Sequence, residues 1–209
     1  MVQEMLKPSY FLSDEKSHDV LELYHGSSPL FLSFPHSGNI YPDDFGYDRK
    51  LTFEQIDFPS DKYVDEIFSE AKCLELSTIK ANFPRAYLDV NRHQHDIDVN
   101  MIEGGENWYG RLLPTGSVQV GATLFWSKSR DLKIYDRKLP VKEAKNRLAN
   151  FFIPYHQSMT RLVEQIREEH GFAYILDCHS MTRFDSKLRG GKERPQIDIG
   201  TRLGGSCAP

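Results

Sequence analysis

The sequence predicts an α/β protein with a mixed, mainly parallel β-sheet that is flanked by helices on both faces. Short apolar runs alternate along the chain with segments of helical periodicity, which is typical of such sheets. The clearest helical pattern, over residues 141–169, leads directly into an apolar run at 172–177. His36, Arg92 and His179 each follow a predicted strand. Because ligands collect at the carboxyl ends of strands in these folds, we expect the functional site at this edge of the sheet.

The first third of the chain predicts two strands and one helix. Apolar runs at 21–23 and 30–34 are predicted strands, and the second stops at the turn-rich tetrapeptide Pro35-His36-Ser37-Gly38. Residues 60–72 predict a helix with Ser60 as its N-cap. One face of this helix would carry the apolar side chains of Val64, Ile67, Phe68 and Ala71.

The rest of the chain predicts two more strands around a long helix. Residues 86–90 are expected to form a strand, and residues 93–131 are expected to form long loops with short strands. The helix over 141–169 should be kinked or divided at Pro154 and should end at Gly171. Residues 172–177 then predict a buried strand that leads into Cys178-His179-Ser180.

Length and composition indicate one domain over residues 1–209 that acts on a small molecule. The 209 residues suffice for a single core, and the formal charge of -4 with no Lys/Arg cluster argues against a nucleic-acid surface. No apolar stretch reaches the roughly 18 residues of a membrane span, and the N-terminus has no signal-peptide pattern, so the cytoplasm is expected. Three cysteines without a CxxC pair do not predict disulfides or a thiolate metal site.

Two histidines and an aspartate are the candidate metal ligands. His36 and His179 both follow apolar strands that could lie side by side. A single histidine after a strand is more often structural or solvent-facing than a ligand, so the pair together carries the prediction. A catalytic zinc site takes three protein ligands and keeps one open position. Asp61, at the start of the predicted helix, is the best third candidate, and helix capping is its alternative role. Asp177 could orient an imidazole from the same strand face.

Arg85, Asn91 and Arg92 bracket the predicted strand at 86–90 and suit an anionic substrate. Arginine holds carboxylates with a planar fork of donors, although either arginine could instead pair with a surface acid. His93 and His95 follow directly, either as an extension of the metal site or as a solvent-facing loop pair.

Seven sequence motifs, taken together, resemble the N-formylglutamate amidohydrolase family. From about residue 30 to the last residue the chain carries, in family order, FPHSG, SDKYVDEIF, PRAYLDVNR, KIYDRKLP, PYHQSM, DCHS and GGSCAP. This family is more distantly similar to zinc carboxypeptidases and aspartoacylase. The resemblance implies their α/β fold and cleavage of the N-formyl, or another N-acyl, amide of glutamate or a similar acidic amino acid.

The resemblance also implies roles for individual residues. His36, Asp61 and His179 would hold one Zn²⁺ per chain, with Asp65 as the alternative to Asp61. Arg85, Asn91 and Arg92 would hold the substrate carboxylate. The residues expected to contact and orient the ligands are Ser37, Asp177 and Ser180.

One expected catalytic group has no match in the sequence. The general acid/base glutamate of the family is expected beyond Pro209, so we expect the chain to lack the C-terminal part of the fold. Glu193 does not match the position by motif, and Glu103 and Glu106, in the long loop, are alternatives only in principle. Two alternatives therefore stay open, namely a non-catalytic zinc- and carboxylate-binding protein and a hydrolase of another acylated amide. A nucleophilic Cys178 is disfavoured, because strand alternation points its side chain away from that of His179.

Overall fold

The computed structural model describes residues 20–105, 108, 116–183, 194–201 and 205. Internal contacts divide the chain into two compact units, Met1–His179 and Ser180–Pro209, and every helix and strand named below lies in the first. Within the described residues, none of the helices combines the length and the apolar character that a bilayer span requires. The single domain expected over residues 1–209 stays a prediction.

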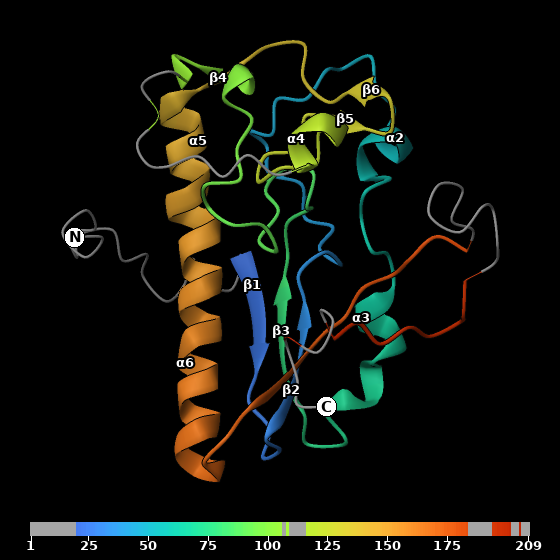
Figure 1. Ribbon diagram of the computed structural model, residues 1–209, viewed down its shortest axis with the longest axis vertical. Coiled ribbons are helices and arrows are strands. Elements are labelled where there is room, and N and C mark those ends of the chain that lie inside the picture. Colours follow the sequence, from blue (N-terminus) through green and yellow to red (C-terminus); the bar gives the residue numbers. More distant parts are fainter. Residues whose placement is uncertain (1–19, 106–107, 109–115, 184–193, 202–204, 206–209) are drawn as a thin grey trace. The chain divides into compact units, whose positions relative to one another are not determined.

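The secondary structure of the first unit consists of short strands, short helical turns and one long helical segment (Figure 1). The strands are β1 (Leu21–Tyr24), β2 (Leu30–Phe34), β3 (Ser77–Ala81), β4 (Ile102–Glu103), β5 (Lys128–Ser129), β6 (Leu132–Lys133), β7 (Leu139–Pro140) and β8 (Tyr174–Asp177). The α-helices are α2 (Phe53–Asp57), α3 (Val64–Ile67), α4 (Ser117–Val120), α5 (Val141–Arg147) and α6 (Ile153–His170). Two 3₁₀ turns, Ser69–Ala71 and Val99–Met101, and a π-helical turn, Leu148–Phe152, complete the set.

The main sheet is mixed and has the strand order β1-β3-β2-β8. β1 runs antiparallel to β3, whereas β3, β2 and β8 are parallel to one another. In the β2–β8 pair, Ser33 lies opposite Asp177. This register brings the residues that follow the two strands, including His36 and His179, to the same edge of the sheet.

The predicted strands at 21–23, 30–34 and 172–177 correspond to β1, β2 and β8, whereas the strand predicted at 86–90 is wrong. Residues 86–90 are all buried, but their backbone turns instead of pairing with the sheet. The Tyr87 amide donates to the Pro84 carbonyl at 3.0 Å, and the Asp89 amide donates to the Leu124 carbonyl at 2.8 Å. An apolar run therefore marked core burial here and not strand pairing. The third sheet strand is β3, which the sequence analysis missed.

The helix predicted over residues 60–72 is also largely wrong. Its place is taken by the single turn α3 and the 3₁₀ turn Ser69–Ala71. Tyr63 precedes α3 with a φ of 64°, so the chain enters this turn through a left-handed residue. Ser60 does not cap it, because the Ser60 hydroxyl donates to Asp57 at 2.9 Å.

The long helix is present with the expected interruption. A π-helical turn lies between α5 and α6, and Pro154, the second residue of α6, lies just after it. Because proline has no amide proton, a carbonyl of the preceding turn lacks its helical donor here. Gly171 ends α6 with a φ of 80°, a conformation that glycine adopts without strain.

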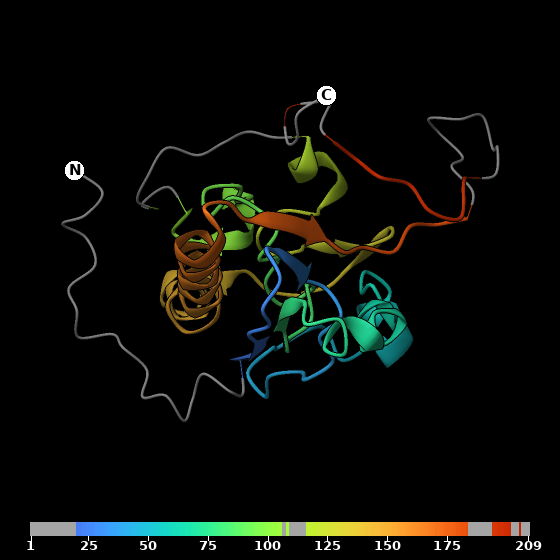
Figure 2. The same ribbon diagram turned by 90° about the horizontal axis from the view of Figure 1, so that it is seen from below.

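Side chains of β2 alternate between two apolar clusters. Phe31 belongs to the larger cluster, to which α6 contributes Tyr155, Leu162 and Ile166. On the other face, β2 side chains join a smaller cluster with α3 and the 3₁₀ turn after it. Figure 2 shows the α6 and α3 ribbons on opposite sides of the sheet. The buried members of this cluster are Leu32, Phe34, Val64, Ala71 and Cys178.

β8 is exposed, contrary to the buried strand that its apolar sequence predicted. Tyr174 and Ile175 are 63% and 51% exposed. β8 is the last strand of the sheet, and no described residue pairs with its outer edge. An apolar run shows that a strand is suited to burial, but its side chains are buried only where other elements pack against them. The side of the sheet edge that carries His179 is consequently open.

A buried arginine joins the long helical segment to the loops above the sheet. Arg147 is 1% exposed, and its guanidinium donates to the carbonyls of Phe45 and Tyr87 at 3.0 and 2.9 Å and to the hydroxyl of Tyr135 at 2.8 Å. It also pairs with Glu143 and stacks 4.0 Å from the centre of the Tyr87 ring. Because Tyr87 lies two residues before Asp89, this contact fixes the loop that supports the candidate site.

We expect Arg147→Met to destabilise the protein by about 3 kcal/mol or more, because it leaves two buried carbonyls and the Tyr135 hydroxyl without the Arg147 donor. Urea unfolding monitored by circular dichroism measures this change. Arg161→Met is the matched control, since Arg161 lies exposed on α6. Equal stability of the two variants would contradict the structural role of Arg147.

Candidate metal centre

Three side chains from separate segments converge at the carboxyl edge of the sheet. His36 follows β2, Asp61 lies in the turn before α3, and His179 follows β8. His36 Nδ1 lies 3.1 Å from Asp61 Oδ2 and 3.1 Å from His179 Nδ1, and His179 Nδ1 lies 2.8 Å from Asp61 Oδ2. Within the described part of the chain, this is the one group of histidine, cysteine and acidic side chains close enough to share a metal ion.

Backbone contacts hold His36 and Asp61 together. The Asp61 amide donates to the His36 carbonyl at 3.0 Å, and the Ser37 hydroxyl donates to the Asp61 carbonyl at 3.1 Å. Gly38 follows, and any Cβ at this position would overlap the backbone of Ala81 to Phe83. The PHSG tetrapeptide therefore presses against the end of β3 and presents His36 toward Asp61.

The outer nitrogen of each imidazole contacts a carboxylate. His36 Nε2 lies 2.8 Å from Asp89 Oδ1, and His179 Nε2 lies 3.0 Å from Asp177 Oδ2. An ionised carboxylate only accepts hydrogen bonds, so each Nε2 can donate a proton to its outer carboxylate. With a cation at the centre of the cluster, these carboxylates would keep the proton on Nε2 and leave both Nδ1 lone pairs for the cation.

Asp89 is fully buried and satisfied by donors from several segments. The Asn91 amide donates to Oδ1 at 3.0 Å, and Arg85 Nη2 and Trp126 Nε1 donate to Oδ2 at 2.9 and 3.0 Å. Burial alone would raise the pKa of Asp89, but the neighbouring His36, Arg85 and Trp126 outweigh it and lower the pKa. The sequence analysis missed this residue, although a lone carboxylate inside the apolar run at 86–90 was a usable signal.

Asp177 supports His179 as expected from its position on β8. It accepts hydrogen bonds from Ser33 Oγ at 2.9 Å and from Asn91 Nδ2 at 2.8 Å in addition to its contact with His179. Burial acts to raise the pKa of Asp177, but these partners outweigh it and hold the pKa below its usual value. Asn91, expected at the substrate, is therefore engaged with the His179–Asp177 pair.

The cluster attracts positive charge. Burial acts to lower the pKa of His179, but hydrogen bonds to Asp177 and Asp61 outweigh it and raise the pKa to about 9. In the absence of a metal, a proton is held between the imidazole and the carboxylates. A divalent cation would take the place of that proton.

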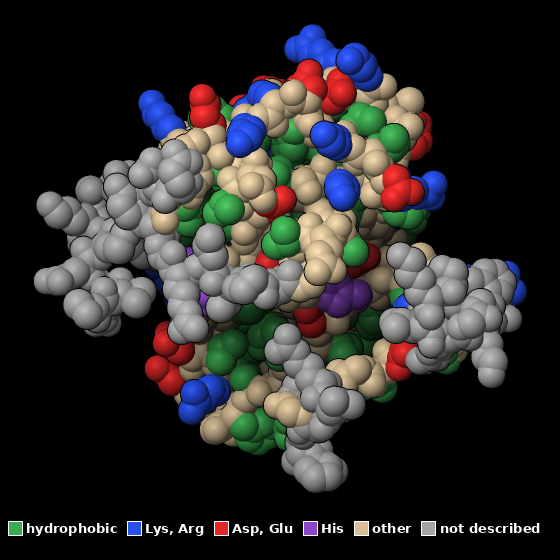
Figure 3. Space-filling view, turned by 45° about the horizontal axis from the view of Figure 1, so that its top comes forward, with side chains coloured by type: hydrophobic (Ala, Val, Ile, Leu, Met, Phe, Trp, Pro, Cys, Tyr) green, Lys and Arg blue, Asp and Glu red, His purple; other side chains and the backbone are tan. Residues whose placement is uncertain are grey.

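Two imidazole nitrogens and one carboxylate oxygen fit a zinc site with an open position. Zinc bonds of about 2.0–2.2 Å place tetrahedral ligand atoms roughly 3.3 Å apart, slightly more than the separations of 2.8–3.1 Å found here. His36 is buried, whereas the side chain of His179 is 33% exposed. Figure 3 shows histidine side chains reaching the surface beside acidic ones. The site is accessible from the His179 side.

Two alternatives for the metal ligands lie elsewhere. Asp65 pairs with Lys80 at 3.2 Å and is not part of the cluster. His93 and His95 form a loop pair with ring centres 5.2 Å apart and do not extend the cluster. The histidines of the loop are therefore separate from the candidate site.

The remaining candidates of the sequence analysis divide as follows. Arg85 is paired with Asp89, whereas Arg92 makes only long contacts, at 3.7 Å to Asp89 and 3.9 Å to Asp96. Cys178 packs in the smaller apolar cluster, and burial raises the pKa of its thiol to about 12, which disfavours a nucleophilic thiolate.

The glutamates and Ser180 are not among the three converging side chains. Glu103 is exposed in β4, and Ser180 belongs to the second unit. Glu106 and Glu193 lie outside the described residues.

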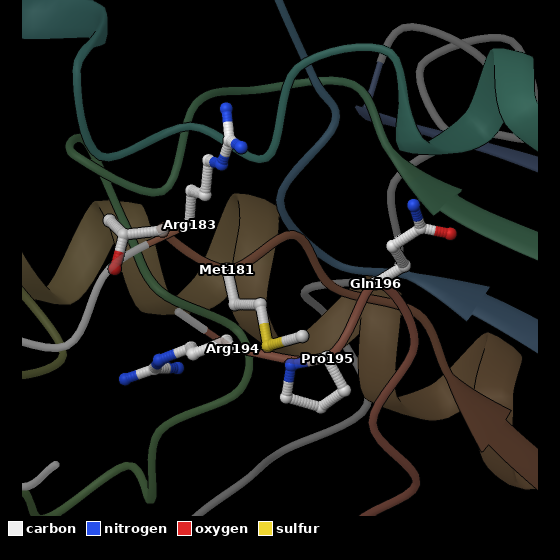
Figure 4. Close-up of a pocket in the computed structure, with 6 residues that line it drawn as sticks. Met181, Arg183, Arg194, Pro195 and Gln196 are labelled. Carbon is white, nitrogen blue, oxygen red and sulfur yellow. The ribbon is translucent and has the colours of Figure 1, made fainter. Parts of the chain in front are cut away.

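The second unit contains a cavity of about 470 Å³, and the described residues that line it include no histidine or acidic side chain. These described lining residues are Met181, Thr182, Arg183, Arg194, Pro195 and Gln196. Figure 4 shows that the side chains of Arg183 and Arg194 point in different directions. The two guanidinium groups therefore do not converge on one point.

We expect one zinc ion per reconstituted chain, and loss of that ion in His36→Ala and His179→Ala, because each removes one of the converging nitrogens. Elemental analysis after dialysis measures the metal content. His93→Ala is the matched control, since His93 lies on the exposed loop nearby. Equal loss of metal in the control would argue against the cluster.

Asp89→Asn should weaken zinc binding about 10- to 100-fold, the range expected when a ligand histidine loses its carboxylate partner. A competition titration with a chromophoric chelator measures the affinity. The control is Asp131→Asn, at an exposed carboxylate. Unchanged zinc affinity in Asp89→Asn would mean that this carboxylate does not orient His36.

A family model and two curated proteins match this sequence. The model of the N-formylglutamate amidohydrolase family matches residues 28–209. Over 193 residues, or 91% of the chain, the sequence is 29% identical to the N-formylglutamate deformylase of Pseudomonas putida and 26% identical to that of Pseudomonas aeruginosa. The chain spans 65% and 66% of the lengths of these curated relatives.

Two solved structures share the fold. The N-formylglutamate amidohydrolase of Ralstonia eutropha JMP134 superposes with a TM-score of 0.77 and 31% identity, covering 86% of this chain and 64% of that protein. A gene product of Agrobacterium tumefaciens gives a TM-score of 0.53 at 15% identity, covering 83% and 60% of the two chains, and indicates similarity of fold alone.

Proposed function

The chain belongs to the N-formylglutamate amidohydrolase family, and on that premise we propose that it is a zinc-dependent amidohydrolase. Its substrate would be the N-formyl amide of glutamate or of a similar acidic amino acid, and its products formate and the free amino acid. The observation that carries the proposal is the convergence of His36 Nδ1, His179 Nδ1 and Asp61 Oδ2. Catalytic zinc sites of hydrolases use the same donor types and leave one position for water or substrate.

The chain's own residues prepare this site for hydrolysis. A bound zinc ion would polarise the amide carbonyl and lower the pKa of water at the open position. Asp89 and Asp177 fix both imidazoles with Nδ1 toward that position. The partial exposure of His179 leaves a side from which a substrate can approach. The general acid/base glutamate stays a prediction.

Arg92 is the better of the two arginines for a substrate carboxylate. Arg85 donates to Asp89 through Nη2 and Nε and to the Pro59 carbonyl through Nη1. Arg92 has no contact with Asp89 or Asp96 shorter than 3.7 Å, and one third of its side chain is exposed. We therefore assign the carboxylate of the acidic substrate to Arg92, with Arg85 in a supporting position.

A small molecule remains the proposed partner, and the cytoplasm the proposed location. The formal charge of -4 and the absence of a basic cluster in the sequence support the first proposal. Cobalt, nickel or iron could also bind two imidazoles and a carboxylate, so zinc is proposed on donor chemistry.

Formate release from N-formylglutamate should require the metal and should be lost in His36→Ala and His179→Ala, while His93→Ala keeps the wild-type rate. A coupled formate assay on reconstituted and chelator-treated protein measures this, with acetyl-glutamate and formyl-aspartate to define the substrate. Release that is indifferent to stringent metal removal would overturn the proposal. Binding of N-formylglutamate by calorimetry without any release would instead identify a non-catalytic binding protein.

A further inference from the structure

A tryptophan contacts the buried carboxylate behind the candidate metal site. Trp126 Nε1 donates to Asp89 Oδ2 at 3.0 Å, and the guanidinium of Arg85 lies 4.7 Å from the centre of the Trp126 ring. The indole therefore makes two contacts, one through its N–H and one through its face. The indole N–H and the stacked Arg85 both donate to Oδ2 of Asp89, whereas His36 contacts Oδ1.

The loop that carries Trp126 is held firmly in place. The Asp89 amide donates to the Leu124 carbonyl at 2.8 Å, so the backbone two residues before Trp126 is joined directly to Asp89. The amides of Ser127 and Lys128 both donate to the Gly121 carbonyl, at 2.9 and 3.3 Å. Gly121 has a φ of 71°, and a Cβ there would overlap the side chains of Ser127 and Lys128. Trp126 consequently approaches Asp89 from a fixed direction.

We propose that Trp126 is a positioning residue of the metal site, acting on His36 through Asp89. The catalytic consequence of this inference rests on the proposed function, whereas the contacts of Trp126 are independent of it. The hydrogen bond from the indole fixes the orientation of the Asp89 carboxylate, and the fixed carboxylate accepts the proton of His36 Nε2. His36 Nδ1 is thereby kept as the nitrogen that faces Asp61 and His179.

Trp126 also contacts Arg85, a second donor to the same Asp89 oxygen. Arg85 Nη2 and Nε lie 2.9 and 3.3 Å from the same Oδ2 that Trp126 contacts. A guanidinium stacked on an indole face is restrained in its plane, so Trp126 also restrains the main counter-charge of Asp89. Arg92 lies 3.7 Å from this oxygen and would draw the carboxylate toward itself if the indole contact were lost.

Trp126→Phe separates the two contacts, because it keeps an aromatic face for Arg85 and removes the N–H donor. Trp108→Phe is the matched control, since Trp108 is the other of the two tryptophans and packs edge-on against Phe125 at 6.5 Å without contacting Asp89. Zinc affinity is measured by chelator competition, and the proton positions on the His36 ring by long-range ¹H–¹⁵N correlation spectra. Urea unfolding shows whether the two variants are equally stable.

Trp126→Phe is expected to bind zinc about 10-fold more weakly, the low end of the effect of altering the partner of a ligand. Its metal-free His36 ring should carry the proton on Nε2 less often than in the wild type, and Trp108→Phe should match the wild type in both readouts. Wild-type zinc affinity together with the wild-type tautomer ratio of His36 in Trp126→Phe would overturn the proposal. A purely structural role would instead lower stability without changing the tautomer.

A second measurement needs no change at position 126. In the wild-type protein, the indole N–H signal of Trp126 should exchange slowly with solvent and shift on zinc addition, whereas that of Trp108 should not shift. Equal behaviour of both signals would overturn the proposal even where Trp126→Phe fails to fold. Absence of formate release with an intact Trp126 response would contradict the proposed hydrolysis alone.

Discussion

A carboxylate buried away from water is stable only when donors surround it, and the candidate site is organised around such a group, Asp89. Its donors come from separate segments: a histidine after β2, an arginine and a backbone amide within its own turn, and a tryptophan from a distant loop. None of these segments can move far without leaving the buried charge unpaired. The requirement to neutralise one carboxylate therefore couples the loop around Asp89, the loop before β5 and the end of β2, and it orients His36 as a consequence.

The parallel pairing of β2 with β8 supplies the other half of the site. Ser33 and Asp177 lie opposite each other, and the Ser33 hydroxyl donates to Asp177 while contacting the Tyr155 hydroxyl of α6 at 3.1 Å. The histidines that follow these strands are not equivalent, because His36 is buried while His179 is one third exposed. We interpret His36 as the fixed ligand of the pair and His179 as the ligand on the side open to a substrate.

The sequence was sufficient to predict the elements that depend on local patterns. β1, β2, β8 and the long helix with its break at Pro154 follow from apolar runs, periodicity and proline chemistry, and motif order identified the family. It was not sufficient where tertiary contacts decide. Residues 86–90 are apolar because they are buried, yet hydrogen bonds to Pro84 and Leu124 turn them away from the sheet. The partner of Arg85 could not be predicted either, because a guanidinium pairs equally well with an internal carboxylate and with one on a substrate.

The two arginines of the PRAYLDVNR segment consequently differ in role: Arg85 supports Asp89, and Arg92 is available to a substrate. Arg85 is engaged through Nε and both Nη atoms and is stacked on Trp126, so a substrate carboxylate could bind it only by displacing Asp89 or Pro59. That displacement would expose the buried Asp89 charge and loosen His36, which makes it costly. Arg92, at 3.7 Å from Asp89, can turn toward a substrate while that carboxylate keeps its closer donors. The guanidinium of Arg92 can bind one planar carboxylate in a fixed direction through two parallel hydrogen bonds. Such a contact would place an acidic amino acid against the open position of the proposed metal site.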